Sequence, residues 1–480
     1  MPKRNLVYVA LIVLVAALAL QLDSTKARHS PEYTLFDPIV DVYDIINKNY
    51  VAQTEDQKLI NGSINGMLHT LDFYSEFIPA EEVDDFQKQT SGSYEGIGIG
   101  IDTQDGFLTV ISPFENSPAD KAGIRAGDVI LEVNGQSTKG WSNSRAVKEL
   151  TGGLGSSVTL RLLRQDGIEE NVSVVREEVH VPTVRGWRRT AAGWDYLLDD
   201  AAKIGYLRIT QFTGDTIEEM DRAIAGLLQQ KMEALILDLR NNPGGLMSSA
   251  VDVVDRMIDE GVIVSTRGAH TEPQVIKAHS AQTYPRFPLV VLIDQGSASG
   301  SEIVAGSLQD HGRAVIVGER SWGKGSVQRT IKLPDSGAIV KLTTDYYYLP
   351  KGRCVHRLPG AREWGVAPDV EEALDPNRID SLRAKMETLM RSEPPQPRGK
   401  EISSKMVETK PVLRLPADPN QPRVSPERLY LRKQAKELLE LDNQLAQALK
   451  QCKGLTRAQP GLPALAGPNK SEAPRLTNSK

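Results

Sequence analysis

Two short stretches of the sequence combine residue types that can do covalent chemistry. The first, residues 294–302, holds three serines separated by small residues and directly follows an apolar run at 289–293. A turn from a buried strand into a helix would expose one serine hydroxyl beside a helix N-terminus, where backbone amides can stabilise an oxyanion. Serine and glycine also cap helices, so this stretch alone predicts either a nucleophile or a polar helix cap.

The second stretch, residues 318–325, reads Gly-Glu-Arg-Ser-Trp-Gly-Lys-Gly and nearly matches a phosphate-binding loop. Gly325 stands where such a loop has the Ser or Thr that ligates magnesium, and residues 326–333 alternate like a strand. A phosphate loop must open a helix, because the helix N-terminus helps to bind the phosphates. The pattern therefore disfavours a nucleotide-hydrolysing function.

The serine turn and the glycine-flanked Lys324 together suggest a serine–lysine dyad. A serine hydroxyl is a poor nucleophile until a base takes its proton. Lysine can be that base only if its pKa falls far below about 10.4, which burial among apolar groups achieves. Gly323 and Gly325 would allow close packing around the lysine stem, and we expect Trp322 to exclude water. We assign His311 to an inter-element turn.

A glycine-rich segment at 96–100 alternates glycine with isoleucine. A dinucleotide-binding loop has different glycine spacing and opens a helix, whereas strand-like residues 107–111 come next here. The succession that follows, with an Asn-Gly hairpin at 134–135, resembles a PDZ domain over about 92–179; its other matching stretches are 117–119, 122–124 and 126–130.

The PDZ resemblance implies that this domain recognises the C-terminal ends of peptides. Exposed backbone amides of a glycine-rich loop would hold the peptide's carboxylate while the peptide adds as a strand. The residues that match the loop are Gly96, Ile97, Gly98 and Ile99. A purely structural β-sandwich is the alternative interpretation.

The remaining sequence divides into helical, mixed and proline-rich regions. Residues 31–91 show helical spacing of apolar side chains. Between 181 and 375, an amphipathic helix at 216–229 accompanies apolar runs typical of buried parallel strands, at 234–239, 289–293 and 314–317. Prolines interrupt residues 376–480, which we expect to be largely disordered apart from one helix near 427–451.

Several motifs in one order resemble the carboxyl-terminal processing, or tail-specific, protease family. The resemblance covers about residues 36–374, and Gly300 departs from it by standing where alanine is common. The matching segments are 206–208, 238–245, 297–303, 318–319, 323–328, 343–344 with Tyr348, and 365–369.

The resemblance implies a serine endopeptidase and assigns roles to individual residues. Ser299 would be the nucleophile, Lys324 the general base and Gln328 the group that orients the lysine. The amides of Gly300 and Gly245 would form the oxyanion hole, with Gly244 as the alternative to Gly245. No metal, nucleotide or other cofactor is implied.

Charge and cysteine content exclude several other classes. With 57 basic and 62 acidic residues the net charge is −5, which disfavours a broad nucleic-acid binder. Two cysteines are too few for a disulfide framework or a four-cysteine zinc site. No His-x-x-x-His pair occurs among the seven histidines, so a zinc hydrolase is disfavoured.

The N-terminus indicates export. Lys3 and Arg4 precede an apolar run at 6–20, which suits a signal peptide, and extension to residue 22 would make a membrane tether. We predict a periplasmic protein, or one anchored to a membrane with its bulk outside the cytoplasm.

The predicted fold is multidomain α/β, as expected for 480 residues. Its regions are a signal peptide or anchor (1–30), a helical region (31–91), a PDZ domain (92–180), a protease core (181–375) and the tail (376–480). The predicted partners are proteins with unstructured C-terminal ends, and no nucleic acid. The alternative function is a catalytically inert PDZ scaffold that binds peptides.

Overall fold

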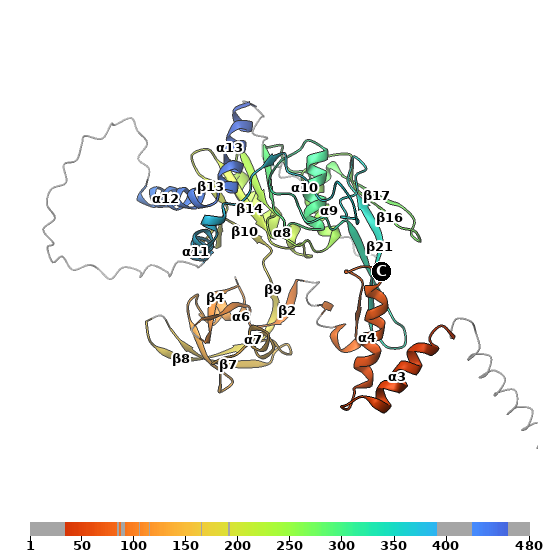
Figure 1. Ribbon diagram of the computed structural model, residues 1–480. Helices are drawn as coiled ribbons and strands as arrows, with labels where there is room; N and C mark the ends of the chain where they lie inside the picture. Colours follow the sequence, from red (N-terminus) through yellow and green to blue (C-terminus); the bar gives the residue numbers. More distant parts are fainter. Residues whose placement is uncertain are drawn as a thin grey trace, which may run out of the picture. The chain divides into compact units, whose positions relative to one another are not determined.

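The computed structural model describes residues 34–390 and 425–458, except for gaps at 84–85, 88–91, 105, 115, 165 and 191–192 (Figure 1). The predicted signal peptide or anchor lies outside the described residues. Within the described ranges, every helix is too short or too polar to cross a membrane. The chain forms two compact parts: residues 1–83 with 328–343, and residues 84–327 with 344–480.

Among the described residues, the first part contains helices α3 (Asp37–Asn49) and α4 (Asp56–His69), strand β1 (Glu76–Ile78), and portions of the paired strands β20 (Ser326–Lys332) and β21 (Ile339–Tyr348). Helices α3 and α4 have no buried residue, and they precede β1 and the short helix η1 (Ala80–Glu82). The end of α4 is followed by a turn in which Asp72 accepts the amides of Tyr74 and Ser75. Strand β1 then pairs antiparallel with residues 339–341 of β21.

The residues that resemble a PDZ domain form a β-rich unit with two short helices. Its sheet has the strand order β3-β4-β5-β7-β8, while β6 pairs with β5 and β2 pairs with β9. Alternate side chains of the strands fill one apolar core, which includes Leu108, Ile130 and Leu160. The elements are β2 (Ser93–Gly96), β3 (Ile99–Gln104), β4 (Phe107–Pro113), α6 (Pro118–Lys121), β5 (Val129–Val133), β6 (Gln136–Ser137), α7 (Asn143–Leu150), β7 (Ser157–Leu163), β8 (Glu169–Val175) and β9 (Glu177–His180).

The candidate protease core is built on a mostly parallel sheet with the strand order β10-β14-β15-β18-β19-β22. Strands β14 (Ile204–Ile209), β15 (Ala234–Asp238), β18 (Leu289–Ile293) and β19 (Val315–Gly318) run parallel, and all residues of β15 and β18 are buried. This confirms the prediction from the apolar runs and the multidomain α/β class. The other strands are β10 (Val184–Arg185), β11 (Arg188–Thr190), β12 (Gly193–Asp195), β13 (Leu197–Asp199), β16 (Val262–Arg267), β17 (Gln274–Lys277), β20 (Ser326–Lys332) and β22 (Val370–Glu371).

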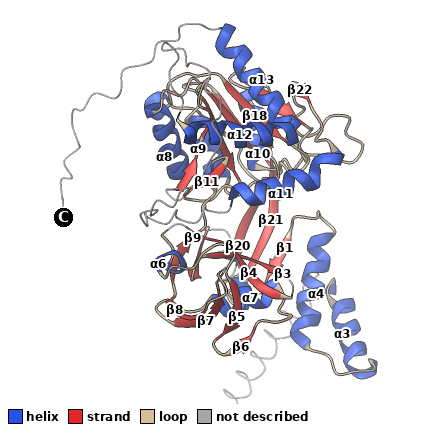
Figure 2. Ribbon diagram, turned by 90° about the vertical axis from the view of Figure 1, so that its left-hand side faces the viewer, coloured by secondary structure: helices blue, strands red, loops and turns tan. Residues whose placement is uncertain are grey.

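Helices cover both faces of this sheet (Figure 2). On one face α8 (Thr216–Gln229), α9 (Met247–Asp255) and α10 (Gly300–Asp310) pack against side chains such as Leu207 and Leu237. On the other face α11 (Ile379–Met390), α12 (Pro426–Leu441) and α13 (Asn443–Ala458) cover Tyr206 and Ile236. The apolar pattern of each strand supplies both faces, because alternate side chains point to opposite sides.

The predicted single helix at 427–451 is wrong. Residues 426–458 form two helices, α12 and α13, and α11 lies before the part of the tail that is not described. Asp442 separates the two helices because its backbone leaves the helical conformation (φ −99°, ψ 88°) and its carboxylate accepts the amide of Leu445 at the start of α13. Leu438, Leu445 and Leu449 are buried against the sheet, so these helices are a layer of the core.

Candidate active site

Three loops of the candidate site leave the same edge of the sheet. The parallel neighbours β15, β18 and β19 end at Asp238, Ile293 and Gly318, and each is followed by one of the stretches that could do chemistry. The carboxyl ends of adjacent parallel strands lie side by side, and open α/β sheets bind their ligands at this edge. The topology therefore brings together the Pro-Gly-Gly turn (residues 241–245), the serine turn (residues 294–302) and the lysine loop (residues 318–325).

The serine turn is a strand-to-helix connection, as predicted. Strand β18 ends at Ile293, and α10 begins at Gly300. Asp294 holds the turn against the neighbouring loop, because its carboxylate accepts the amides of Gly296 and Asn241. Ser299 has φ +54° and ψ −113°. A non-glycine residue rarely adopts such angles, and local strain of this kind clusters at functional sites.

The structure distinguishes the three serines of the turn. Ser297 and Ser301 are fully buried, and their hydroxyls donate to the carbonyl oxygens of Leu239 (2.8 Å) and Asn242 (2.9 Å). These two hydroxyls therefore join the serine turn to the Pro-Gly-Gly turn. Ser299 is only half-buried. Of the three, Ser299 is thus the serine whose position suits a nucleophile.

A buried carboxylate connects the serine turn to the lysine loop. Oε2 of Glu302 accepts the backbone amides of Ser299 (2.9 Å) and Lys324 (2.8 Å). Its Oε1 accepts the hydroxyl of Ser321 (2.6 Å) and the amide of Gly323 (2.7 Å). Burial raises the pKa of Glu302, and the four hydrogen bonds oppose that shift because they favour the charged form.

A buried tyrosine connects the same two residues on their carbonyl sides. The hydroxyl of Tyr347, on β21, lies 3.0 Å from the carbonyl oxygen of Ser299 and 2.8 Å from that of Lys324. Tyr347 is 1% exposed, so packing fixes its position. Glu302 and Tyr347 therefore hold the backbones of Ser299 and Lys324 next to each other.

Glu302 and Tyr347 are site residues that the sequence motifs did not identify. Glu302 stands three residues after Ser299, which is the spacing of a capping box, and this local signal could have indicated its bond to the Ser299 amide. Tyr347 had no such signal, because it is 48 residues from Ser299 and 23 from Lys324 in the chain.

The surroundings of Lys324 agree with one prediction and contradict another. A Cβ atom on Gly325 would lie 2.5 Å from the backbone nitrogen of His356, and one on Gly323 would lie 2.8 Å from the ring of Trp364. The flanking glycines thus permit close packing, as predicted. The expectation that Trp322 excludes water is wrong, because this side chain is 56% exposed. Residues 356–364 pack against the lysine loop instead.

The Pro-Gly-Gly turn passes directly beside Ser299. A Cβ atom on Gly244 would lie 2.7 Å from the Cβ atom of Ser299 and 2.9 Å from the amide nitrogen of Gly300. The amide of Gly244 donates to the side-chain oxygen of Asn242 (2.9 Å). Within the described part of the chain, the amides of Gly245 and Gly300 have no hydrogen-bond acceptor. This arrangement favours Gly245 over Gly244 as the second oxyanion donor.

Gln328 belongs to the other compact part of the chain. It lies on β20, and its side-chain amide donates to the hydroxyl of Thr343 (3.1 Å). Its predicted role toward Lys324 stays a prediction.

The predicted carboxylate-binding loop connects β2 to β3. The side chains of Ile97 and Ile99 are buried in the domain core. The loop therefore presents backbone atoms to a ligand rather than these two side chains. Gly98 has φ +75°, and a Cβ atom there would lie 2.4 Å from that of Ser117. Burial raises the pKa of Tyr94 to about 12, while the amides of Gly98 and Ile99, which face its hydroxyl, lower that pKa. Strand β3 is an edge strand of its sheet.

Comparisons with known proteins match three parts of the chain. Models of the activating protease CtpB N-terminal domain, the PDZ domain and peptidase family S41 match residues 13–82, 85–163 and 203–372. The carboxy-terminal-processing protease of Bartonella bacilliformis is 36% identical over 378 residues, which are 77% of this chain and 82% of the relative. The carboxy-terminal processing protease CtpA of Bacillus subtilis is 34% identical over 379 residues, 77% of each chain.

A solved structure, the photosystem II D1 C-terminal processing protease, is 28% identical with a TM-score of 0.40. The similarity covers 75% of this chain and 98% of that chain.

The Glu302 carboxylate generates a first prediction. In Glu302→Gln one acceptor oxygen becomes an NH₂ group, which faces a backbone N–H in either orientation of the amide. A buried donor without a partner costs about 1–3 kcal/mol. We therefore expect the free energy of unfolding, measured with urea, to fall by this amount, and labelling of Ser299 by a fluorophosphonate to be lost in protein that is still folded.

The matched control is Glu319→Gln, a more exposed carboxylate that accepts one hydrogen bond from Gln295 near the same loops. Its stability should change by less than about 0.5 kcal/mol, as at ordinary surface positions. Wild-type labelling of a folded Glu302→Gln protein would show that this carboxylate does not organise the site.

Proposed function

The chain belongs to the carboxy-terminal processing proteases of peptidase family S41, and from this premise we propose that it is an exported serine endopeptidase. Its substrates would be proteins with unstructured C-terminal ends, cleaved near those ends. The observation that carries the proposal is the shared anchoring of Ser299 and Lys324 by Glu302 and Tyr347.

In the proposed mechanism, neutral Lys324 takes the proton of the Ser299 hydroxyl while the serine oxygen attacks the carbonyl carbon of the scissile peptide bond. The amides of Gly245 and Gly300 donate to the oxyanion that forms. Lys324 returns the proton to the leaving amine, and an ester joins Ser299 to the substrate's acyl group. Water, deprotonated by Lys324, then hydrolyses the ester and regenerates the serine. Gln328 would orient the lysine.

The conformation of the site supports these roles. Ser299 is held in a strained conformation at the start of α10, where the amide of Gly300 is available as a donor and the helix dipole favours negative charge. The close contact of Gly244 with Ser299 leaves no room for a side chain between the turn and the nucleophile. A substrate carbonyl beside Ser299 would therefore lie against backbone amides.

The dyad predicts a specific mutational pattern. Lys324→Arg keeps the positive charge but cannot act as a base, because a guanidinium stays protonated at working pH. We expect Ser299→Ala and Lys324→Arg each to lower kcat by about 10⁴-fold or more. Mass spectrometry of the products from an unstructured peptide measures the loss, and circular dichroism verifies that the variants are folded.

The control for this experiment is Lys351→Arg, an exposed lysine in a turn of the same compact part. Its turnover should equal that of the wild type. A folded Lys324→Arg enzyme with near wild-type turnover would refute the dyad. A wild-type protein that binds C-terminal peptides but is never labelled by a fluorophosphonate would instead be the inert scaffold.

We further propose that the PDZ domain recognises the substrate's terminal carboxylate. Residues 96–99 present backbone amides, and the adjacent edge strand β3 has a free side to which an extended peptide can add. The carboxylate would replace the hydroxyl of Tyr94 as the group that faces the amides of Gly98 and Ile99.

Amidation of the substrate tests this recognition. Because hydrogen bonds to a charged group contribute about 1.5–3 kcal/mol, kcat/KM for a free-acid peptide should exceed that for its C-terminal amide by roughly 10- to 100-fold. The control is the rate of fluorophosphonate labelling without peptide, which requires an intact active site but no C-terminal carboxylate. Equal kcat/KM values for acid and amide would exclude the carboxylate role and leave the dyad in place.

Export is the last component of the proposal. The basic residues and the apolar run at 6–20 support it, and residues 6–22 would be the membrane tether if this segment is retained. An alkaline phosphatase fused after residue 40 should be active, and deletion of residues 6–20 should abolish that activity. An inactive full-length fusion, in cells that export control fusions, would contradict a location outside the cytoplasm.

A further inference from the structure

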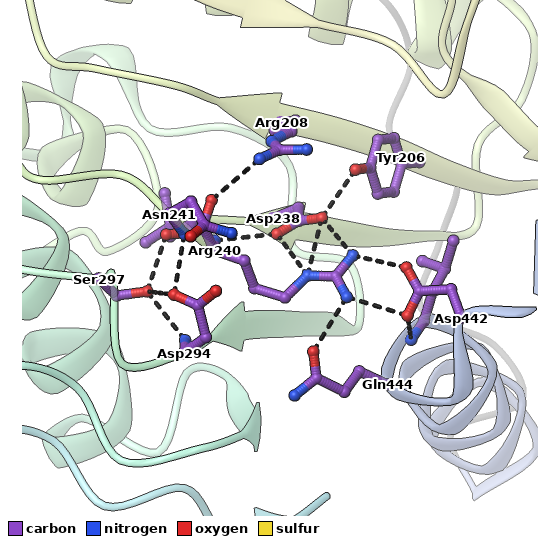
Figure 3. A network of polar contacts seen from close by, with 11 residues as sticks. Tyr206, Arg208, Asp238, Arg240, Asn241, Asp294, Ser297, Asp442 and Gln444 are labelled. Carbon is purple, nitrogen blue, oxygen red and sulfur yellow. Dashed lines mark hydrogen bonds and ion pairs between the residues drawn. The ribbon is translucent and has the colours of Figure 1, made fainter. Parts of the chain in front are cut away.

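A buried ionic network lies between the candidate oxyanion turn and the C-terminal helices (Figure 3). Its centre is Arg240, which follows β15 and comes directly before the turn at 241–245. The side chain of Arg240 is 10% exposed, and the carboxylates of Asp238 and Asp442 are 0% and 4% exposed. Asp442 is 202 residues from Arg240 in sequence.

Every N–H group of the Arg240 guanidinium has an acceptor. Nε donates to Asp238 (3.0 Å), and Nη2 donates to Asp238 (2.7 Å) and to Asp442 (2.8 Å). The two N–H groups of Nη1 donate to Asp442 (2.9 Å) and to the side-chain oxygen of Gln444 (3.0 Å). Since arginine has five such groups, three of the five depend on the junction between α12 and α13.

The charges of the network also depend on Asp442. Burial by itself would raise the pKa of Asp238, but attraction to Arg240 and hydrogen bonds from it lower that pKa to about 2. Asp238 is therefore ionised at any working pH and balances one cation. Arg208 lies in the same cluster and donates to the carbonyl oxygen of Arg240 (3.2 Å). Without Asp442, the buried guanidinium of Arg240 and the partly buried one of Arg208 would face a single carboxylate, which is unfavourable in a desolvated site.

The backbone connects Arg240 to the turn without an intervening flexible segment. Its amide donates to Asp238 (2.9 Å), and its carbonyl oxygen accepts the bond from Arg208. The amide of the next residue, Asn241, donates to Asp294 of the serine turn (2.8 Å). A displacement of Arg240 therefore moves the start of the turn that ends at Gly245.

We propose that Asp442, assisted by Gln444, is a positioning residue that fixes the oxyanion turn through Arg240. This inference rests on the proposed function, because it takes the amide of Gly245 as an oxyanion donor. It makes the junction of α12 and α13 part of the catalytic apparatus, although neither residue touches substrate. Loss of this anchor affects the transition state, where the oxyanion forms, more than binding of the substrate.

The test is Asp442→Asn. The side-chain oxygen of asparagine can still accept the amide of Leu445 and a bond from Nη1, but its NH₂ group then faces Nη2 of Arg240. We expect kcat to fall about 10- to 100-fold, the size of effect that misplaced catalytic groups produce. KM should stay within about twofold, and the pH dependence of kcat/KM should keep its wild-type shape because the base is intact.

The matched control is Asp200→Asn. Asp200 forms an ion pair with Arg432 of α12 (2.8 Å), so this variant also removes one bond between the C-terminal helices and the rest of the core. It does not touch Arg240. Its kcat should stay within about twofold of the wild type, as expected for a partly exposed ion pair. Thermal unfolding curves of all variants identify a temperature at which every variant is folded, and kcat is measured at that temperature.

A second variant covers the case in which Asp442→Asn does not fold. Gln444→Met removes one of the five acceptors of Arg240, together with the bond from the Gln444 amide to the carbonyl oxygen of Glu372, and keeps the ion pair with Asp442. We expect a smaller effect than that of Asp442→Asn, a fall in kcat of about three- to tenfold with KM unchanged. The turnover of Ser299→Ala and the fluorophosphonate labelling of the wild type are measured in the same series.

The outcomes separate the two hypotheses. If turnover requires Ser299 but Asp442→Asn and Gln444→Met keep the kcat of Asp200→Asn, the positioning role is overturned and the proposed function stands. The positioning role is equally overturned if kcat falls only in proportion to the folded fraction. If wild-type turnover does not depend on Ser299, the proposed function and this inference both fall.

Discussion

The carboxylate of Glu302 is the group on which the geometry of the candidate site depends. Its two oxygens accept four hydrogen bonds, and these come from two loops that follow different strands. A fully buried charge is unfavourable by itself, so it persists only where several donors surround it. No neutral side chain of this size can accept four such bonds, because an amide replaces one oxygen by a donor. The need to satisfy one buried charge thus fixes the distance between the backbones of Ser299 and Lys324.

The parallel sheet explains why these loops meet. Strands β15, β18 and β19 are neighbours in register, so the segments that follow them leave one edge of the sheet together. Hydroxyls and carboxylates then connect the loops in sequence: Ser297 and Asp294 join the serine turn to the Pro-Gly-Gly turn, and Glu302 joins it to the lysine loop. The buried side chains of Ser297, Ser301 and Glu302 are all used to connect these loops. Hydrogen bonds of this kind hold backbone donors in place, and preorganised donors are the condition for the electrostatic catalysis that we propose for this site.

The two helical layers contribute differently to the edge of the sheet at which the candidate site lies. Helix α10 begins directly after Ser299 and packs on one face, so its first turn is part of the candidate site. Helices α11 to α13 cover the other face with leucines and alanines, and apolar burial of this kind has no directional preference. The ionic network at Arg240 and Asp442 determines how α13 is placed on the sheet, because its hydrogen bonds form in only one register of the helix. The proline-rich sequence before α12 therefore leads to a structural layer of the core.

The sequence alone determined the elements and the residues that could react. Continuous apolar runs predicted β15, β18 and β19, glycines next to Lys324 predicted close packing, and the serine spacing predicted a strand-to-helix turn at Ser299. All of these signals are local, because they arise from backbone periodicity or from residues within a few positions of each other. The tertiary structure decided which groups hold the reactive residues. Tyr347 and Asp442 come from distant segments, Trp322 turned out to be exposed, and a single carboxylate divided one predicted helix into α12 and α13. Contacts between remote segments depend on how the strands are ordered in the sheet. A local pattern in one sequence does not determine that order.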